Sequence, residues 1–410
     1  MARILQVCNT DFYLTKFLAP LVRALVAQGH TVEGVCEGGD RIAPNLFGPG
    51  VRLHPFTFPR ANSPWQFIEA IVQMRRLLRA GHFDCVNGHN RNASIVARLA
   101  ARLESVPVNL YTAHGFYFHD DQKPLARAAT IGLEAALAYI TDFTLSQSTE
   151  DVTLMTSRGF IPSDRITRIG NGIDTSRFRP RQAERTEIES ALGLRHGRFR
   201  VASTGRLVQG KGFGDLLTAF AELHRDDPTV ELTLIGGNIA QDISPYQAEF
   251  LAKARALGVQ DALVVTGITD RVEDYLAACD VFVLPSYREG LPRSLLEAMA
   301  TELAVIATDI RGCREAVTPE SGYLFAPHDV AQLVALLRRL HADPGLRRSL
   351  GQHARARVVA EFDERNYVAR QVKAIEQLVG RIPPTISTVE AQKPVQEPAR
   401  HSRNSAICKG

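Results

Sequence analysis

The sequence predicts an α/β protein made of two Rossmann-like, doubly wound domains that face a central cleft. Two observations lead to this prediction. Strand and helix patterns alternate along most of the chain, and the alternation stops once near the middle before it begins again. Such alternation is typical of parallel sheets, because parallel neighbours need a crossover connection that is usually a helix. The length of 410 residues also suits two domains.

The first half of the chain contains short β-rich runs separated by amphipathic helical patterns. We expect strands at 3–8, 31–36, 51–57, 84–87 and 107–112, and helices at 13–28, 65–80, 92–104 and 123–140. The pattern then breaks at 171–198, a stretch rich in Gly, Pro and charged residues. We place the connection between the domains there, so that the first domain covers 1–180.

The second half repeats the alternation and ends in a change of composition. We expect strands at 199–204, 231–235, 262–266, 280–284, 303–307 and 322–325, and helices at 213–224, 246–257, 270–278, 291–300 and 328–341. The second domain then covers 181–360, and residues 345–380 have a helical pattern. Residues 381–410 contain four prolines and few apolar residues, which predicts a disordered tail.

Composition excludes several classes of protein. The chain has 45% hydrophobic and 22% charged residues, as ordinary globular proteins do, and its net charge of +4 is too small to indicate a nucleic-acid partner. The six cysteines show no metal-ligand spacing, which predicts buried free thiols in a reducing, cytoplasmic compartment. No apolar run reaches the roughly 18 residues of a membrane span, and the N-terminal run is too short for a signal peptide.

A glycine-rich loop at 205–212 follows an expected strand and precedes an expected helix. Its spacing is nearly that of a Walker A loop, but Gly212 stands where a Ser or Thr should bind magnesium, which disfavours an ATPase. A loop at a helix N-terminus that carries Arg206 and Lys211 can still bind a diphosphate without a metal. The alternative is a surface turn with two solvated cations.

Two glutamates, Glu289 and Glu297, lie eight residues apart around a strand end. The run 281–286 reads as a buried strand, so Glu289 is expected in the loop at its carboxyl end and Glu297 about two turns into the following helix. The backbone N–H groups of Gly290 and Leu291 lie near the helix start and favour an anion. Alternatively, Glu297 is a solvated helix residue, although its apolar neighbours argue against an exposed face.

Polar residues also follow the expected strands of the first domain. His114 and Gly115 come after one strand, His89 and Asn90 after another, and Asp11 after the first. Ligands of doubly wound sheets bind outside the carboxyl ends of the strands, so these side chains are candidates for the cleft. For His114, a structural histidine with satisfied hydrogen bonds is the alternative.

The segment 65–78 is amphipathic and is accompanied by three basic residues, Arg75, Arg76 and Arg79. It could contact an anionic bilayer. The more ordinary interpretation is a Rossmann helix packed on its own sheet.

Several motifs together resemble glycosyltransferase family 4. They are TGRLVQGKGF (204–213), DYLAACDVFVLPSYREGLPRSLLEAMA (274–300), IATDIRGCREAV (306–317) and ESGYLF (320–325). The N-terminal segments 4–32, 87–103 and 111–115 look like the capsule and lipid-linked-oligosaccharide branch of that family. The resemblance covers residues 2–380, so the tail lies outside it.

The resemblance implies a GT-B fold, a retaining mechanism, a UDP-sugar donor and no metal cofactor. The chain contains no Asp-x-Asp triplet of the kind that metal-dependent glycosyltransferases use, which agrees with that implication. It further implies a lipid-linked or polysaccharide acceptor, a C-terminal helix (361–380) that returns to the first domain, and contact with the cytoplasmic face of the inner membrane. A departure from many relatives is the sequence CNTDFYL after the first strand, where they carry a Gly-rich loop; the capsule-type branch often lacks those glycines.

The roles that the resemblance implies are specific. Arg206 and Lys211 would bind the donor diphosphate, Glu289 the hydroxyls of the transferred sugar, and Glu297 the ribose. The loop at Gly267 and Ile268 would line the base. His114 would lie near the anomeric carbon, and Asp11, His89 and Asn90 would belong to the acceptor side. Glu289, His114 and Lys211 are the expected catalytic residues.

Two other functions remain open from the sequence. A UDP-sugar 2-epimerase could use the same fold, and it would convert its substrate without an acceptor. A non-catalytic sugar-nucleotide binder is less favoured, because it has no need of Arg206, Lys211, Glu289 and Glu297 together. A dinucleotide oxidoreductase is weaker still, since no G-x-G-x-x-G follows the first strand.

Overall fold

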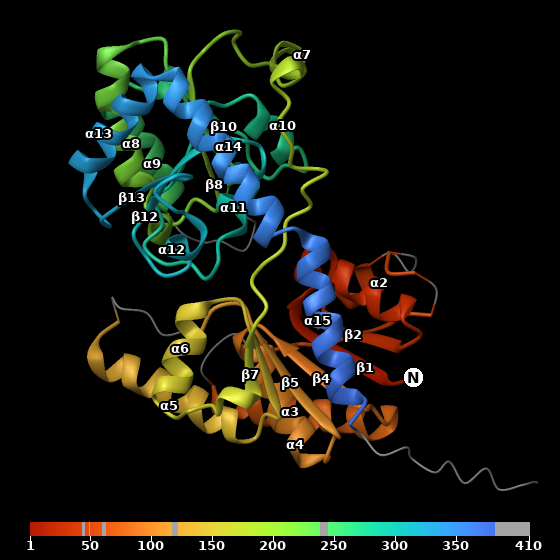
Figure 1. The fold of residues 1–410 in the computed structure, drawn as a ribbon. Helices are drawn as coiled ribbons and strands as arrows, with labels where there is room; N and C mark the ends of the chain where they lie inside the picture. Colours follow the sequence, from red (N-terminus) through yellow and green to blue (C-terminus); the bar gives the residue numbers. More distant parts are fainter. Residues whose placement is uncertain (43–45, 49, 60–62, 117–121, 238–244, 382–410) are drawn as a thin grey trace, which may run out of the picture.

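The computed structural model describes residues 1–42, 46–48, 50–59, 63–116, 122–237 and 245–381, and contains two parallel sheets (Figure 1). The first sheet has the strand order β3-β2-β1-β4-β5-β6-β7 and the second has β10-β9-β8-β11-β12-β13. All pairings between these strands are parallel. Both orders reverse direction at the first strand of the domain, which is the arrangement that opens a binding crevice at the strand ends. The two-domain α/β prediction is therefore confirmed.

The strands of the first sheet are β1 (Arg3–Thr10), β2 (Thr31–Glu37), β3 (Arg52–Pro55), β4 (Cys85–His89), β5 (Val108–Ala113), β6 (Phe143–Ser146) and β7 (Ile166–Arg168). Its helices are α1 (Asp11–Tyr13), α2 (Ala19–Ala27), α3 (Pro64–Gly81), α4 (Arg91–Leu103), α5 (Pro124–Tyr139) and α6 (Thr149–Ser157). The second domain has β8 (Arg200–Thr204), β9 (Glu231–Ile235), β10 (Leu263–Val265), β11 (Val281–Leu284), β12 (Ala304–Thr308) and β13 (Gly322–Phe325). Its helices are α7 (Arg185–Ala191), α8 (Phe213–Asp226), α9 (Tyr246–Ala256), α10 (Val272–Ala277), α11 (Arg293–Ala300), α12 (Cys313–Ala316), α13 (Val330–Ala342), α14 (Pro344–Glu361) and α15 (Glu364–Val379).

The sequence missed three elements of the first domain. Strands β6 and β7 have only four and three residues, and α6 has nine. Runs this short show too little periodicity to be recognised, although Ser148 does cap α6 by accepting a hydrogen bond from the backbone of Asp151.

Three expected segments differ in detail from those in the structure. The helix expected at 13–28 is divided by a π-helical turn at Leu14–Leu18, and the connection expected at 171–198 contains α7. Helix α11 begins at Arg293, because Pro292 takes the N-cap position.

Helices cover both faces of each sheet. In the first domain, α3 and α4 pack on one face through residues such as Met74 and Val96, and α2 packs on the other through Leu21 and Leu25. The second domain is divided in the same way between α8 with α13 and α11 with α14. The described cysteines, all but Cys408, are buried free thiols, as expected.

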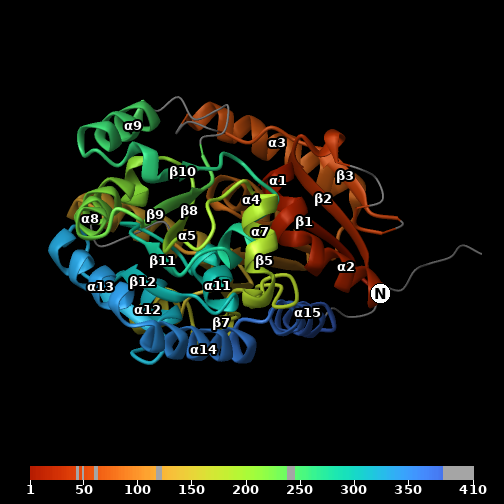
Figure 2. The same cartoon turned by 90° about the horizontal axis from the view of Figure 1, so that it is seen from above.

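The chain crosses between the domains twice, and the two crossings pair with each other. Ile173 forms an isolated parallel bridge with Asp363, in which the Ile173 N–H donates to Phe362 O at 2.8 Å. Asp363 then caps α15, which packs beside α2 with Tyr367 and Ile375 in the first-domain core. Figures 1 and 2 both show α14 over the second domain and α15 against the first.

No helix among the described residues combines the length and apolar character needed to cross a membrane. The predicted disordered tail lies outside the described residues, apart from Arg381.

Candidate active site

Glycines follow three neighbouring strands at the carboxyl edge of the second sheet. Gly205, Gly236 and Gly267 follow β8, β9 and β10, and a Cβ on Gly236 would lie 2.4 Å from the carbonyl oxygen of Gly205. The loops can therefore pass close to one another only without side chains there. Arg206 is exposed at this edge, and Ile268 has 68% of its surface exposed. Both side chains are accessible to a ligand at the crevice.

Gly212 explains why the loop departs from a Walker A sequence. Its φ is +65°, and a Cβ at this position would lie 2.0 Å from the carbonyl oxygen of Pro285. Neither Ser nor Thr can be accommodated without a backbone shift. The close packing of this loop on the end of β11 fixes the position of Lys211 one residue earlier.

Lys211 and Glu289 form an ion pair between two loops that are far apart in the sequence. Lys211 Nζ lies 2.6 Å from Glu289 Oε1, and the side chains are 25% and 14% exposed. The family resemblance implies separate roles for these residues, Lys211 with a diphosphate and Glu289 with a sugar. Their contact means that a donor bound between them would meet a preassembled pair of opposite charges.

The loop before α11 carries Gly290 and Leu291 and contacts the first domain. A Cβ on Gly115 would lie 3.0 Å from the Cα of Gly290, and a Cβ on Gly290 would lie 2.6 Å from His114 O. Glycines at both positions thus let the two backbones touch. The Leu291 side chain is buried, so only its backbone can serve a ligand, and its carbonyl accepts from Asn171 Nδ2 at 2.9 Å.

Glu297 lies on α11 with its side chain partly buried, rather than on a fully solvated face. Its carboxylate has no hydrogen-bond partner among the described residues. Burial raises the pKa of Glu297, and the positive charges of Arg293 and Arg177 oppose that rise. A carboxylate that is held near the crevice without an internal partner can accept hydrogen bonds from ligand hydroxyls.

His114 and His89 contact each other at the ends of β5 and β4. His89 Nδ1 lies 3.0 Å from His114 Nε2, and His89 Nε2 lies 2.8 Å from Gln6 Oε1. Asn87 Nδ2 donates to the same Gln6 oxygen at 3.0 Å. Burial lowers the pKa of His89 well below its usual value and that of His114 to about 3. Both rings are therefore neutral at physiological pH, and His114 can act in the cleft only as a neutral hydrogen-bonding group.

The other first-domain candidates lie at neighbouring strand ends. Asp11 begins α1, where its carboxylate accepts from the backbone of Phe12 at 2.7 Å. Asn90 precedes α4 and accepts through Oδ1 from the backbone N–H of Asn9 at 3.1 Å. The structure therefore places the predicted residues of both domains at the facing edges of the two sheets.

Two residues of the site, Tyr13 and Arg293, were not predicted from the sequence. The Tyr13 ring meets the His114 ring edge-on at 5.3 Å between centroids, and both residues line a cavity of about 140 Å³ with Arg293. Arg293 donates to Gly172 O at 2.6 Å and lies 5.1 Å from the centroid of the Phe17 ring. The only signal for Arg293 was its position four residues before Glu297, on the same side of the helix.

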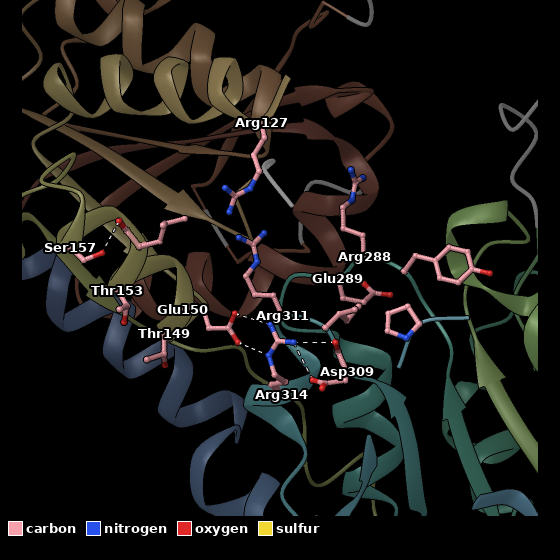
Figure 3. Close-up of a pocket in the computed structure, with 14 residues that line it drawn as sticks. Arg127, Thr149, Glu150, Thr153, Ser157, Arg288, Glu289, Asp309, Arg311 and Arg314 are labelled. Carbon is pink, nitrogen blue, oxygen red and sulfur yellow. Dashed lines mark hydrogen bonds and ion pairs between the residues drawn. The ribbon is translucent and has the colours of Figure 1, made fainter. Parts of the chain in front are cut away.

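A larger cavity of about 510 Å³ lies between helices α5 and α6 and the loops after β11 and β12. Figure 3 shows its lining residues, with Arg127 contributed by the first domain and Arg288 and Arg311 by the second. Arg311 Nη1 lies 2.7 Å from Asp151 Oδ1. Burial raises the pKa of Asp151 to about 6, which the Arg311 charge partly opposes.

Two further residues of the second domain bind the start of α6. Glu315 accepts hydrogen bonds from Ser148 Oγ at 2.7 Å and from the backbone N–H of Thr149 at 2.6 Å. Arg314 Nε lies 3.1 Å from Glu150 Oε1, and this contact is drawn in Figure 3. The second domain therefore binds the start of α6, which Ser148 caps, and these contacts join the two domains.

Comparison with known proteins agrees with this architecture. The family model "Glycosyltransferase Family 4" matches residues 15–177, and "Glycosyl transferases group 1" matches residues 184–357. Alpha-maltose-1-phosphate synthase of Mycolicibacterium smegmatis is 31% identical over 75% of this chain and 81% of its own. The UDP-Gal:alpha-D-GlcNAc-diphosphoundecaprenol alpha-1,3-galactosyltransferase of Escherichia coli is 27% identical over 76% and 79%. The crystal structure of Anabaena HepE (Alr3699) with UDP and glucose has a TM-score of 0.75 at 17% identity and covers 92% of this chain and 99% of HepE.

Two facing Rossmann-like domains with these matches define a glycosyltransferase of the GT-B fold. Within that class, the chain belongs to glycosyltransferase family 4.

Proposed function

We propose that this enzyme transfers a sugar from a UDP-sugar to a polyprenyl-diphosphate-linked or nascent polysaccharide acceptor, with retention of configuration, in cell-surface polysaccharide synthesis. The observation that carries the proposal is the Lys211–Glu289 pair, beside the glycine contact between the domains. A transferase must hold its donor at the boundary between the two domains, where the acceptor can reach it. Lys211 and Glu289 lie at this boundary. The related Escherichia coli enzyme, whose name gives a UDP-galactose donor and a lipid diphosphate acceptor, supports both substrate classes.

The donor would lie along the edge of the second sheet. Arg206 and Lys211 supply positive charge for the diphosphate, Glu297 accepts from the ribose hydroxyls, and Ile268 offers an exposed apolar surface to the base. Negative charge grows on the diphosphate as the glycosidic bond breaks, so the two cations stabilise the transition state more than the ground state. Glu289 would hold the hydroxyls of the transferred sugar so that the acceptor meets the anomeric carbon on the face that the diphosphate leaves.

Three measurements test the donor proposal. Calorimetry should detect binding of UDP, and binding of GDP or ADP in its place contradicts the donor assignment. Turnover should survive EDTA, because Arg206 and Lys211 supply the charge that a metal would; loss in EDTA with recovery in manganese contradicts this. NMR of the product should show the anomeric configuration of the donor, and an inverted product ends the retaining assignment.

Contact with the cytoplasmic face of the membrane is a second part of the proposal, and helix α3 supports it. One face of α3 packs on the sheet through Met74 and Leu78, as a Rossmann helix does. The opposite face exposes Trp65 and Ile68, which are 79% and 51% exposed and lie one turn apart. A buried face and an exposed apolar face occur on one helix, so the two interpretations of this segment do not exclude each other.

The basic residues of α3 contribute less charge than their number suggests. Arg75 and Arg79 both bind Glu104, at 2.6 and 2.9 Å, and this leaves Arg76 with its exposed charge. Insertion of Trp65 should therefore matter more than electrostatic attraction. Trp65→Glu should reduce co-sedimentation with phosphatidylglycerol vesicles, and Val359→Glu in the second domain should not. Equal binding by both variants, or none by the parent protein at low salt, contradicts membrane contact.

A further inference from the structure

A buried ion pair joins the two domains beside the candidate active site. Arg311 lies in the loop after β12, and its Nη1 is 2.7 Å from Oδ1 of Asp151 near the start of α6. The two side chains are 15% and 0% exposed. Figure 3 shows the Arg311 side chain extending from the second domain toward the first. The proposed function gives neither Arg311 nor Asp151 a role.

The ion pair also binds the chain segment that carries His114. Phe116 follows His114 by two residues, and its N–H donates to Asp151 Oδ2 at 3.1 Å. The carbonyl oxygen of Phe116 accepts from Arg311 Nη2 at 3.0 Å. Both backbone groups of this residue are therefore bound by the ion pair, so its position depends on a side chain from each domain.

The residue after Arg311 packs against the loop that carries Glu289. Gly312 has a φ of +83°, and a Cβ there would lie 1.3 Å from the carbonyl oxygen of Gly290. Only glycine fits at this closeness. Gly290 in turn touches the backbone of the segment 114–116, as described above. Because the three backbone segments are in direct contact, a shift of Arg311 moves the loop of Glu289 relative to the first domain.

Sugar transfer depends on the separation of the two domains, because the proposed mechanism uses residues of both. Glu289 belongs to the second domain and His114 to the first. A misplacement of reacting groups by about 1 Å can lower a rate by about 100-fold. A contact that fixes this separation therefore affects catalysis without touching a substrate.

Stability of the fold does not explain the ion pair. Burial raises the pKa of Asp151, so ionisation of this carboxyl lowers the stability of the folded state at neutral pH. Replacing a buried ion pair by apolar side chains is often neutral or stabilising. A role in positioning explains the charges better, because a charge-assisted contact between an arginine and a carboxylate has a defined geometry.

We propose that Asp151 and Arg311 are positioning residues for sugar transfer, and that their ion pair sets the separation of His114 and Glu289 across the cleft. The proposal rests on the proposed function and deepens it, because it assigns the alignment of the two domains to one contact. The proposed diphosphate and ribose contacts come from the second domain alone. Loss of the ion pair should therefore leave UDP affinity intact and lower the rate of transfer.

Three variants test the pair. Asp151→Asn keeps an oxygen for the N–H of Phe116 and replaces the oxygen nearest Arg311 with an NH₂ group. Arg311→Met removes the charge of the long side chain, and Arg311→Lys keeps the charge. Lys16→Met is the control, because Lys16 also pairs across the domain boundary, with Asp270 at 3.0 Å, but belongs to none of the three packed segments.

Kinetics should separate positioning from stability. In Asp151→Asn and Arg311→Met the turnover number should fall about 10- to 100-fold, while UDP affinity by calorimetry stays within about twofold of the parent. Arg311→Lys should retain more turnover than Arg311→Met, and Lys16→Met should match the parent. Thermal unfolding identifies the variants that are folded. Parent-like turnover in a folded Asp151→Asn or Arg311→Met enzyme, or a loss of UDP affinity as large as the loss of turnover, overturns the proposal.

Hydrogen exchange tests the same contact without a transfer assay. The amides of 289–291 should exchange faster in Asp151→Asn and Arg311→Met than in the parent, and Lys16→Met should not change them. Unchanged exchange in both variants overturns the proposal. If the parent transfers no sugar from any UDP-sugar but the exchange differs as expected, the proposed function fails and the role of the pair in placing the Glu289 loop stands. If the parent transfers sugar and both variants match it, the function stands and the positioning role fails.

Discussion

Replacement of Lys211 by alanine should lower the turnover number by about two to four powers of ten, or roughly 3–5 kcal/mol of transition-state stabilisation. The lysine is the cation nearest to Glu289, with 2.6 Å between Nζ and Oε1, and its side chain is only 25% exposed. A charge in such a partly dehydrated place acts more strongly on the growing diphosphate charge than a surface cation does. The substitution also leaves the 14% exposed Glu289 carboxylate without its partner.

The shared ion pair makes the effects of Lys211 and Glu289 dependent on each other. Glu289→Gln keeps the shape of the side chain, so UDP binding should survive while transfer falls. The double variant contains no unpaired carboxylate, so its loss of activity should be smaller than the sum of the single losses, by about 1–3 kcal/mol. Independent effects would mean that the two residues act in separate steps.

Steady-state release of UDP measures these effects, and thermal unfolding shows whether each variant remains folded. Arg225→Ala is a matched control, because this arginine also pairs with a glutamate, Glu222, but is 69% exposed on α8. It should change turnover less than threefold. A Lys211→Ala enzyme with turnover close to that of the parent, or a Glu289→Gln enzyme with unchanged turnover, refutes the reasoning.

Three further predictions concern the first domain and its contacts. Glu315→Ala removes the carboxylate that accepts hydrogen bonds from the start of α6 and should lower the free energy of unfolding in urea by about 2 kcal/mol; no change would mean that this contact does not stabilise the protein. Because the pKa of Asp151 is raised to about 6, the native state holds the carboxyl proton of Asp151 more tightly than the unfolded chain does. The resulting contribution to stability is present below pH 4 and is lost as pH rises through 6. Relative to Asp151→Asn, the parent should lose about 3 kcal/mol between roughly pH 3 and pH 7, and parallel stability curves would contradict this. His89→Leu removes the partner of His114 and should reduce turnover about tenfold without changing UDP affinity. Turnover of the parent should show no histidine titration between pH 5 and 8, because the pKa of His114 is about 3.

The sequence was sufficient to predict the fold class and to name candidate donor residues. Alternation of short apolar runs with amphipathic helices predicted two parallel sheets, because burial leaves a periodic trace along each element. The loop with Arg206 and Lys211 and the segment with Glu289 and Glu297 each lie within about ten residues, so one motif displays them. The short elements β6, β7 and α6 were missed, because each has too few residues for a clear period to show.

The sequence could not show which motifs meet. Lys211 and Glu289 are 78 residues apart and become partners only because β8 and β11 are neighbours in the sheet, so that the loops after them share one edge. The same reason joins His89 to His114, through the pairing of β4 with β5. The meaning of Gly212 also depends on tertiary structure, since the carbonyl of Pro285 occupies the space that a Cβ would need.

The amino-acid sequence by itself therefore determined the order of elements, the two-domain α/β architecture and the local residues of each loop. Tertiary structure decided the ion pair, the neutral histidine pair and the contact of Glu315 with the start of α6. Local periodicity reports whether a residue is buried, but it carries no information about which distant residue fills the space beside it. That choice follows from strand order and from the closest approach that glycines such as Gly115 and Gly290 permit between the two domains.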